Sequence, residues 1–407
     1  MNQNIVLVLL KNKSFFLFWL GFIGYGLGNA IFTISLNWWV YITTGSEVQL
    51  GIVGTLNFLS MMIFSILSGI LVDKFHRKKI IFFSIMLRGV IILFIPILGI
   101  FGSLNLWIVY LIAFTQYITF PFFVNAVNAI MPQFIDKKHL MTANALIDTA
   151  FWFSNIIGFL LGGFLIDSFG VYILIFMSVI IFLITPFLFI RIPYAFQKRG
   201  AKVNFLNFLA DIKDGFGQIF KDKVLLIIIF TWTGVIILFS TGVTNIGWPV
   251  FSREILSAGA EGYGLLVSAS SLSAMIGSII LSIWGSKMRM GRLFLFGLLL
   301  GGFGMIFFSI STTLSISLII IFLTYFHFPM VNVPYWTALQ HRVPEEELGK
   351  VSGASFTVNT GLSPISTFLT GIIMEQVSVT LPFVLSGFSY LASFLIALSN
   401  KELRNLD

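Results

Sequence analysis

Gly69-Ile-Leu-Val-Asp73-Lys-Phe-His-Arg77-Lys78-Lys79 stands between two apolar runs at residues 48–72 and 80–100. Each run has about the 20 residues that a helix needs to cross the hydrocarbon of a bilayer. A loop this short joins antiparallel neighbours, and cations beside a membrane helix mark its cytoplasmic end. The stretch therefore predicts a cytoplasmic turn between two transmembrane helices.

The composition extends this prediction to the whole chain. Of 407 residues, 57% are hydrophobic and only 10% are charged, whereas a soluble domain carries about 25% charged residues. Backbone groups in lipid must be satisfied within their own segment, which favours helices. We predict an all-α membrane protein with twelve transmembrane helices, near residues 15–42, 48–72, 80–100, 104–131, 141–166, 171–190, 224–250, 263–284, 293–310, 315–339, 351–374 and 381–398.

The distribution of cations sets the expected orientation. With both termini cytoplasmic, all of the 24 Lys and Arg residues except Arg88 and Arg253 fall in cytoplasmic segments. The outer loops instead carry acids such as Glu47, Asp167 and Glu375. The net charge of +8 therefore reflects insertion in a lipid bilayer and not binding to nucleic acid. We expect a multi-pass protein of the cytoplasmic membrane with both termini inside the cell.

A polar stretch after the sixth run divides the chain. We predict an N-terminal six-helix half at residues 1–190, a cytoplasmic linker at 191–223 and a C-terminal six-helix half at 224–407. The halves are pseudo-symmetric, since a shift of 208 residues places Pro121 on Pro329. Within the linker, Phe205, Phe216 and Ile219 share one face of an amphipathic helix, which lies either on the inner leaflet or in solvent.

The spacing G-x-x-x-D-x-x-x-R-[KR]-[KR] of the opening stretch resembles a signature of the major facilitator superfamily. Within that superfamily the chain is most similar to bacterial macrolide-efflux exporters, which are drug/proton antiporters. The likeness is carried by the opening stretch with Arg88, by Leu140-Met-Thr-Ala-Asn144-Ala-Leu, and by Val343-Pro-Glu-Glu-Glu-Leu-Gly349. It implies the major facilitator fold and a secondary active transporter that works by alternating access.

The resemblance also implies roles for single residues. Gly69, Asp73, Arg77, Lys78 and Lys79 would form a gating motif, with Asp73 stabilising the start of a facing helix near residues 349–353. Alternatively, Asp73 is a turn and orientation residue.

A further stretch, Ser154-Asn-Ile-Ile-Gly158-Phe-Leu-Leu-Gly162-Gly163, resembles the drug/proton antiporter motif, although Phe159 stands where the motif has Pro. Alternatively, its glycines let another helix pack closely.

Motifs for catalysis are missing from the sequence. It has no G-x-S-x-G elbow, Walker loop or H-E-x-x-H, no cysteine, and only four histidines. We therefore expect no enzyme activity, no cofactor and no metal, and an ion gradient or the substrate's own gradient as the energy source.

Charged residues inside membrane helices are costly and mark candidates for proton coupling. Arg88 and Asp148 lie at similar predicted depths, so they form either a fixed ion pair or a site at which Asp148 takes up protons. His327 lies at the centre of its run, two residues before Pro329, where the helix can bend. It is the preferred proton carrier, unless it only hydrogen-bonds a neighbouring helix.

The resemblance implies that runs 1, 4, 7 and 10 line a central cavity, with 2, 5, 8 and 11 beside them. The substrate-cavity candidates at mid-depth are Asn29, Gln116, Tyr117, Asn155, His327 and Asn359. Each could instead be a hydrogen bond between helices. We expect no cation in this layer, which favours an amphipathic, largely apolar substrate over an anionic one.

These observations together predict a monomeric exporter of amphipathic small molecules of the macrolide or multidrug type, working by proton antiport. One alternative is a dedicated exporter of a single metabolite, such as a siderophore or a lipid-like molecule. A second alternative, from another class, is a membrane receptor or scaffold that does not transport.

Overall fold

The computed structural model describes residues 5–135, 139–193, 205–284, 289–344, 346–404 and 406. The described residues form helices joined by turns, and the chain clusters into two compact units. Unit 1 comprises Met1–Val40 and Leu59–Val203, and unit 2 comprises Tyr41–Phe58 and Asn204–Asp407. The predicted domain boundaries at residues 190 and 224 stay a prediction.

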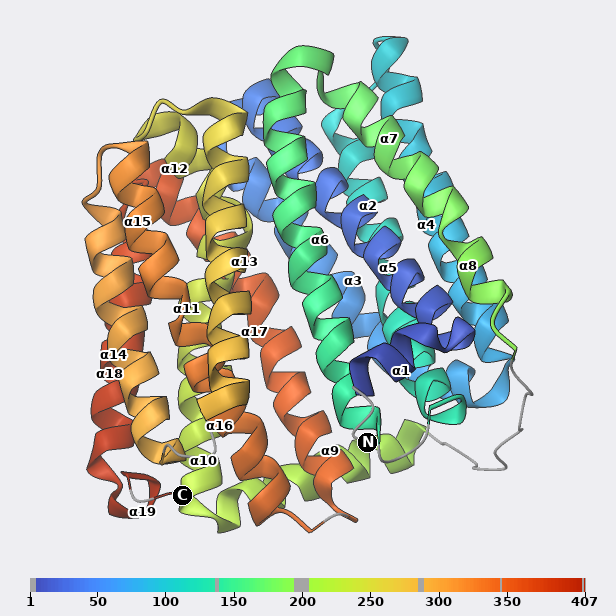
Figure 1. Cartoon of the computed structure of the whole chain (residues 1–407). Helices are drawn as coiled ribbons and strands as arrows, with labels where there is room; N and C mark the ends of the chain where they lie inside the picture. The colour runs from blue at the N-terminus through green and yellow to red at the C-terminus, as the bar shows by residue number, and fades with distance from the viewer. Residues whose placement is uncertain are drawn as a thin grey trace. The chain divides into compact units, whose positions relative to one another are not determined.

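The helices of the first part of the chain lie side by side in Figure 1. Turns break them where Gly45, Gly102 and Gly170 take positive φ angles of 62°, 68° and 79°, which favour glycine. The helices are α1 (Ile5–Lys11), α2 (Lys13–Thr44), α3 (Glu47–Lys74), α4 (Arg77–Ile100), α5 (Leu106–Ile130), α6 (Leu140–Phe169), α7 (Val171–Ile184) and α8 (Pro186–Ile190).

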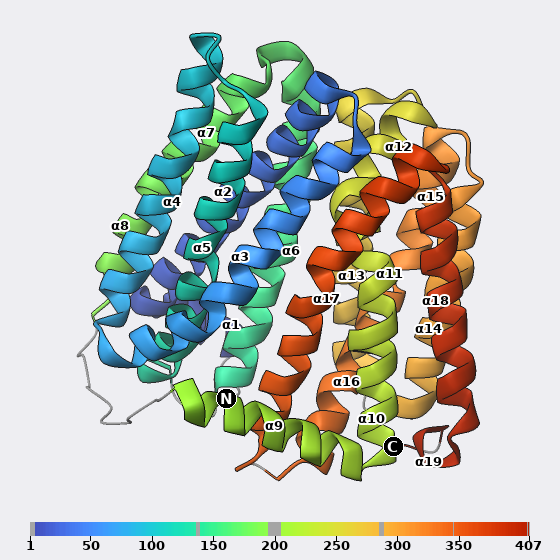
Figure 2. The same cartoon turned by 180° about the vertical axis from the view of Figure 1, so that it is seen from behind.

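Unit 2 holds the helices that follow, seen from behind in Figure 2. Two π-helical segments, Phe230–Ile236 and Val243–Gly247, interrupt the helical stretch that runs from α10 to α12. The helices are α9 (Phe205–Lys221), α10 (Lys223–Ile229), α11 (Ile237–Gly242), α12 (Trp248–Glu254), α13 (Gly259–Trp284), α14 (Met290–Ser309), α15 (Leu314–Tyr325), α16 (His327–Arg342), α17 (Leu348–Gln376), α18 (Leu381–Ser399) and α19 (Lys401–Arg404).

The twelve predicted membrane spans all lie on helices. Among the described residues, 11 helical segments are long and apolar enough to cross a bilayer. The twelfth predicted span is α17, which is long enough with 29 residues but is rich in Ser and Thr. Several of these hydroxyl residues are buried in the protein, among them Ser355, Ser363 and Thr367. Such residues allow close packing between membrane helices, which explains why α17 is the least apolar span.

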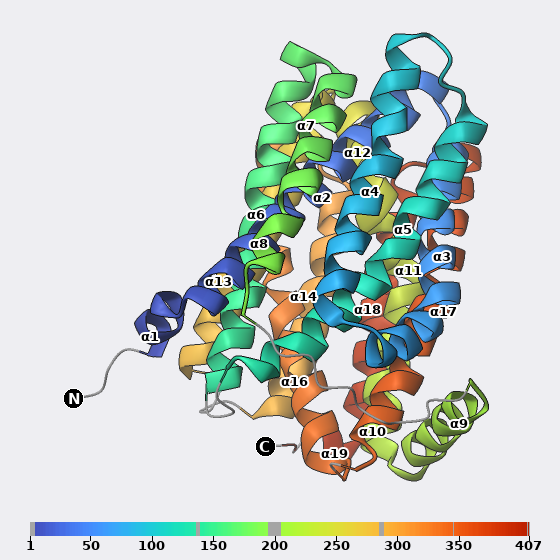
Figure 3. The same cartoon turned by 90° about the vertical axis from the view of Figure 1, so that its right-hand side faces the viewer.

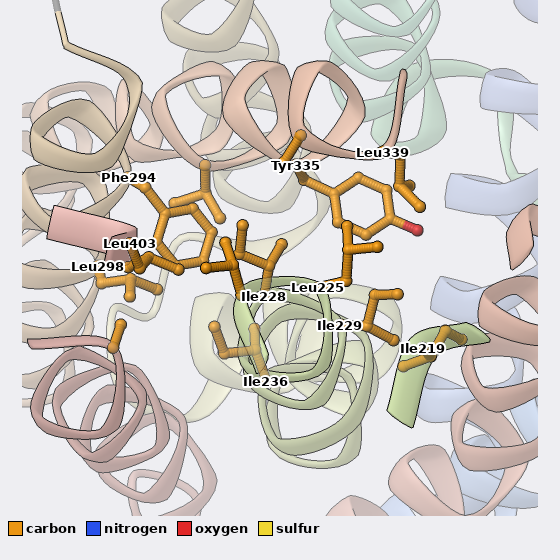
Figure 4. Packing of buried hydrophobic residues seen from close by; sticks show 14 of the residues in the cluster. Ile219, Leu225, Ile228, Ile229, Ile236, Phe294, Leu298, Tyr335, Leu339 and Leu403 are labelled. Atoms are coloured by element: carbon orange, nitrogen blue, oxygen red, sulfur yellow. The ribbon is translucent and has the colours of Figure 1, made fainter. Parts of the chain in front are cut away.

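The amphipathic helix predicted in the linker is present as α9, and its apolar face packs within unit 2. Ile219 is buried in a cluster with Leu225 of α10 and Tyr335 of α16 (Figure 4). A Cβ atom at Gly215 would lie 2.2 Å from the Lys350 carbonyl oxygen, so only glycine allows α9 to approach α17 this closely. The helix lies across the ends of its neighbours in unit 2 (Figure 2), and Figure 3 shows it beside α10.

Residues 41–58 belong to unit 2 because the first half of α3 packs on α17. Glu375 accepts hydrogen bonds from the Ser46 hydroxyl and, at 2.9 Å, from the Val48 amide. A carboxylate at this position caps the N-terminus of α3. Further along the same helix, Thr55 donates to the Pro364 carbonyl at 3.1 Å. The contact therefore combines a helix cap with close packing of two helices.

Candidate functional site

Arg88 lies at the middle of α4. The helix begins at Arg77 and has 24 residues, so Arg88 follows its start by 11 residues, about 16 Å. The side chain is fully buried, with 0% exposed. A position along the helix is not a depth in the bilayer, so the expectation that no cation lies at mid-depth stays a prediction.

Neutral groups of α2 hold the Arg88 guanidinium. Its Nη1 donates to the Tyr25 hydroxyl, and its Nη2 donates to Asn29 Oδ1 at 2.7 Å. Nε has no hydrogen-bond partner among the described residues. Arg88 thus satisfies two of its three donor nitrogens, and neither acceptor is charged.

Aromatic rings surround the same guanidinium. Its carbon lies 5.0 Å from the ring centroid of Phe182 and 5.4 Å from those of Tyr25 and Tyr117. The ring faces carry partial negative charge and attract the cation. Phe123 stacks on Tyr25 with 3.9 Å between ring centroids. The rings come from α2, α5 and α7, so Arg88 joins three helices of unit 1 to α4.

Asp148 lies apart from Arg88 in unit 1. It is exposed on α6, and within the described part of the chain Arg88 has no acidic partner within 4.0 Å. The structure therefore does not bring the two predicted partners together. The assignment of Asp148 as a proton carrier stays a prediction.

His327 occupies a buried polar site in unit 2. The side chain is 2% exposed, and its Nδ1 lies 2.8 Å from the Thr324 carbonyl oxygen. A carbonyl can only accept, so Nδ1 donates to it, and in a neutral imidazole Nε2 then accepts. The Tyr390 hydroxyl lies 2.8 Å from Nε2 and donates to it. Both ring nitrogens are therefore satisfied.

A chain of hydroxyl groups continues from His327 through unit 2. The Ser240 hydroxyl lies near that of Tyr390, and the Ser240 and Ser386 oxygens are 2.7 Å apart. Hydroxyl groups can reverse their hydrogen bonds, because each is both donor and acceptor. If Nε2 gains a proton, Tyr390 can accept from it and turn its own hydrogen toward Ser240. The arrangement can therefore hold a proton without leaving a buried donor unpaired.

The predicted gating motif spans the end of α3, the turn at residues 75–76 and the start of α4. Arg77 is buried and donates to the Ala129 carbonyl at 3.0 Å. Lys78 donates to the carbonyls of Ile190 and Ile192 at 2.9 and 2.7 Å. These carbonyls lie at or near the C-terminal ends of α5 and α8, where the helix dipole favours cations. The two cations therefore fasten the turn to other helices of unit 1.

The remaining motif residues are less constrained. Gly69 has open space where a side chain would begin, Lys79 is exposed, and the Asp73 side chain lies outside the described part of the structure. Burial and the nearby charges of Lys78 and Lys79 lower the pKa of His76 in the turn. This histidine is therefore held neutral beside the cations.

The substrate-cavity candidates divide by burial. Gln116 is fully buried, with its Nε2 3.4 Å from the Ala113 carbonyl, so it belongs to the packing of unit 1. Asn29, Tyr117, Asn155 and Asn359 are partly exposed. Asn29 and Tyr117 meet at Arg88, whereas His327 lies in unit 2. Their contact with a substrate stays a prediction.

The glycines of the antiporter-like stretch bring α2 and α6 together. A Cβ atom at Gly158 would lie 2.4 Å from the Ala30 Cβ, and one at Gly162 would lie 2.4 Å from Ile34 Cγ2. Ser154, in the place of the first motif glycine, donates to the Ile23 carbonyl at 3.1 Å. Close packing between helices therefore accounts for this stretch.

The sequence did not single out Tyr25, Tyr390, Phe182 or Ser240. A tyrosine on a membrane helix is common, and the residues around it in the sequence do not indicate which side chain it will bond. Tyr25 lies one turn before Asn29 on α2 and therefore shares its face. That spacing was the one available signal for the Arg88 site.

Long apolar helices with titratable groups buried among them are typical of a multi-pass membrane protein. The family model of the Major Facilitator Superfamily matches residues 18–367, and the chain belongs to this superfamily. It is a transporter and not an enzyme.

Similar proteins extend the match over nearly the whole chain. Macrolide efflux protein A of Streptococcus pyogenes is 22% identical over 403 residues, which cover 97% of each chain. The enterobactin exporter EntS of Salmonella choleraesuis is 23% identical over 369 residues, or 90% of this chain and 87% of that protein. The crystal structure of the nucleoside transporter NupG superposes with a TM-score of 0.75 at 13% identity, covering 96% of this chain and 100% of the other. The likeness to macrolide-efflux proteins expected from the motifs is confirmed.

Proposed function

We propose that the protein exports amphipathic, largely apolar small molecules of the macrolide or multidrug type across the cytoplasmic membrane, as a monomer, by proton antiport with alternating access. The observation that carries the proposal is the similarity to macrolide efflux protein A over 97% of both chains. Within the proposal, the hydrogen bond between His327 and Tyr390 supports a site that can gain and lose a proton.

The test uses energised inverted membrane vesicles, in which export appears as uptake. Vesicles that contain the protein should accumulate a radiolabelled macrolide against its gradient, and a proton uncoupler should abolish the accumulation. Vesicles without the protein provide the control. Accumulation that persists with the uncoupler would exclude proton antiport, and its absence for every drug tested would exclude a multidrug exporter.

The second candidate is a dedicated exporter of one metabolite. The similarity to the enterobactin exporter over 90% of the chain favours it. Comparing the spent medium of a deletion strain with that of the parent separates the two candidates. A single missing compound with unchanged drug susceptibility would select this second function.

The proposed direction of export needs both termini and α9 on the cytoplasmic side. The support is the cation asymmetry of the sequence. Because the chain contains no cysteine, Gly217→Cys in α9 and Ser103→Cys between α4 and α5 provide single labelling sites. An impermeant thiol reagent added to intact cells should label position 103 and spare position 217. The reverse pattern would overturn the orientation.

Alternating access also needs a gate, and we propose Asp73 for it. Asp73→Asn keeps the shape of the side chain and removes its charge. Transport should fall in vesicles while folded yield stays near that of the parent. Unchanged transport by this variant would contradict the gating role and favour the alternative that Asp73 is a turn and orientation residue.

A further inference from the structure

We propose that Arg88 and Asn29 form a recognition site for an acidic group on the transported molecule, such as a carboxylate or a sulfonate. The inference rests on the proposed export function and specifies that its amphipathic substrates include acids. The Arg88 guanidinium, its incompletely used donor edge and a partly exposed amide carry the argument.

The first step is the charge balance around Arg88. An arginine stays protonated in proteins, and inside a membrane-spanning helix a cation is expected to pair with an opposite charge or to face a polar pathway. The neighbours of Arg88 are a hydroxyl, an amide oxygen and ring faces, and no acidic group of the described chain lies within 4.0 Å. The site therefore carries a positive charge that the described part of the protein leaves without an anion.

The second step is the geometry of the free donors. Nε and Nη2 lie on the same edge of a guanidinium and point in nearly parallel directions, which suits two oxygens of one anion. In Arg88 this edge is incompletely used, because Nε has no partner among the described residues and Nη2 bonds the neutral Asn29 amide at 2.7 Å. The opposite nitrogen is held by Tyr25. One edge is thus fixed by the protein, and the other can take an anion.

The third step is access. Arg88 itself is fully buried, whereas Asn29 and Tyr117 beside it are partly exposed. An incoming anion would displace the Asn29 oxygen from Nη2, and a charge-assisted hydrogen bond is about twice as strong as the neutral one it replaces. The aromatic rings keep the guanidinium in place during this exchange. A purely structural Arg88 would show no preference for anions.

The experiment compares two dyes with the same aromatic scaffold. 1-Anilinonaphthalene-8-sulfonate carries an anionic group, and N-phenyl-1-naphthylamine is its neutral counterpart. Dissociation constants are measured by dye fluorescence on the full-length protein in lipid nanodiscs, and empty nanodiscs of the same lipid correct for partitioning. Arg88→Gln should weaken binding of the anionic dye by about tenfold or more, and should change binding of the neutral dye less than about twofold.

Asn29→Asp provides a second, independent variant. It places a carboxylate where the Asn29 oxygen now meets Nη2, so Arg88 acquires an internal counter-ion. The folded protein should become more heat-stable, lose about tenfold in affinity for the anionic dye and keep the neutral dye. If Arg88→Gln does not fold, this variant alone decides. An unchanged ratio of the two affinities in Asn29→Asp would overturn the proposal.

Arg253→Gln is the matched control, because it removes an exposed outer cation that contacts Tyr41. It should leave both affinities unchanged.

The experiment distinguishes failure of the proposed export function from failure of acid recognition at Arg88. If the parent protein binds both dyes and the Arg88 and Asn29 variants keep the parent ratio, export stands and acid recognition is wrong. If the parent binds neither dye above empty nanodiscs, the amphipathic substrate class is wrong, and acid recognition falls with it.

Discussion

Arg88 in unit 1 and His327 in unit 2 are both buried and have similar hydrogen-bond partners, but they differ in charge. Each lies deep in the protein and is at most 2% exposed. Each bonds the hydroxyl of a tyrosine on another helix, Tyr25 for Arg88 and Tyr390 for His327. The imidazole has both nitrogens satisfied without any charge, whereas the guanidinium keeps its charge and has one donor without a partner among the described residues.

The difference separates two tasks that an antiporter must perform. A group that stays charged can attract an anion in every state of the cycle but cannot carry a proton. A histidine with a reversible hydroxyl partner can gain and lose a proton when its burial changes between conformations. We therefore propose that unit 1 recognises the cargo and that unit 2 exchanges the proton, and the predictions below test this division.

The largest effect is expected from Gly301→Val. A Cβ atom at Gly301 would lie 3.1 Å from the His327 ring and 3.0 Å from the Tyr390 ring, so a valine would force the two rings apart. Overpacking of this kind costs about 1–3 kcal/mol. Uphill transport in vesicles should disappear, and the unfolding temperature in nanodiscs should fall.

Gly361→Val is the control for Gly301→Val, because Gly361 has open space around its Cα. It should retain most uphill transport. Equal loss in both variants would mean that contact with His327 and Tyr390 is not the cause.

The two tyrosines provide the next comparison. Tyr390→Phe leaves Nε2 of His327 buried without a partner, and Tyr25→Phe does the same to Nη1 of Arg88; each loss costs about 1–3 kcal/mol of stability. We expect similar drops in the unfolding temperature. Only Tyr390→Phe should also slow uphill transport of a neutral dye by several-fold. Equal slowing in both variants would contradict the proposal that proton exchange belongs to unit 2 alone.

The smallest effects are expected at the two lysines Lys78 and Lys350. Lys78 bonds two carbonyls near the end of α8, so Lys78→Met should lower the stability of unit 1 by about 0.5 kcal/mol. Lys350 meets Asp214 at 3.2 Å on the surface of unit 2, where ion pairs contribute little. Lys350→Met should not change the unfolding temperature measurably. A larger effect at Lys350 would show that the contact between α9 and α17 depends on this ion pair.

The fold was predictable because lipid leaves few choices. Long apolar runs must become helices, and their cations set the turns, so each predicted span lies on a helix. The least apolar of the predicted spans is α17, whose hydroxyl groups are buried against protein. Sequence hydrophobicity cannot distinguish a polar face that packs from one that is solvated.

The sites were predictable only in part. His327 and Arg88 stood out because titratable residues are rare in apolar runs. Their partners Tyr390 and Tyr25 lie 63 residues away in the chain, and only the packing of the helices brings them together. The expected approach of Arg88 to Asp148 rested on depth alone. Depth does not say which way a side chain points around the helix, and the structure directs Arg88 to α2.

The most direct test of the central claim is uphill transport by His327→Gln in energised inverted vesicles, with counterflow exchange of the same substrate measured in parallel. Glutamine can replace the hydrogen bonds of the ring but cannot take up a proton. The account predicts that accumulation against a gradient is lost while exchange continues near the parent rate. Accumulation at the parent rate would contradict it.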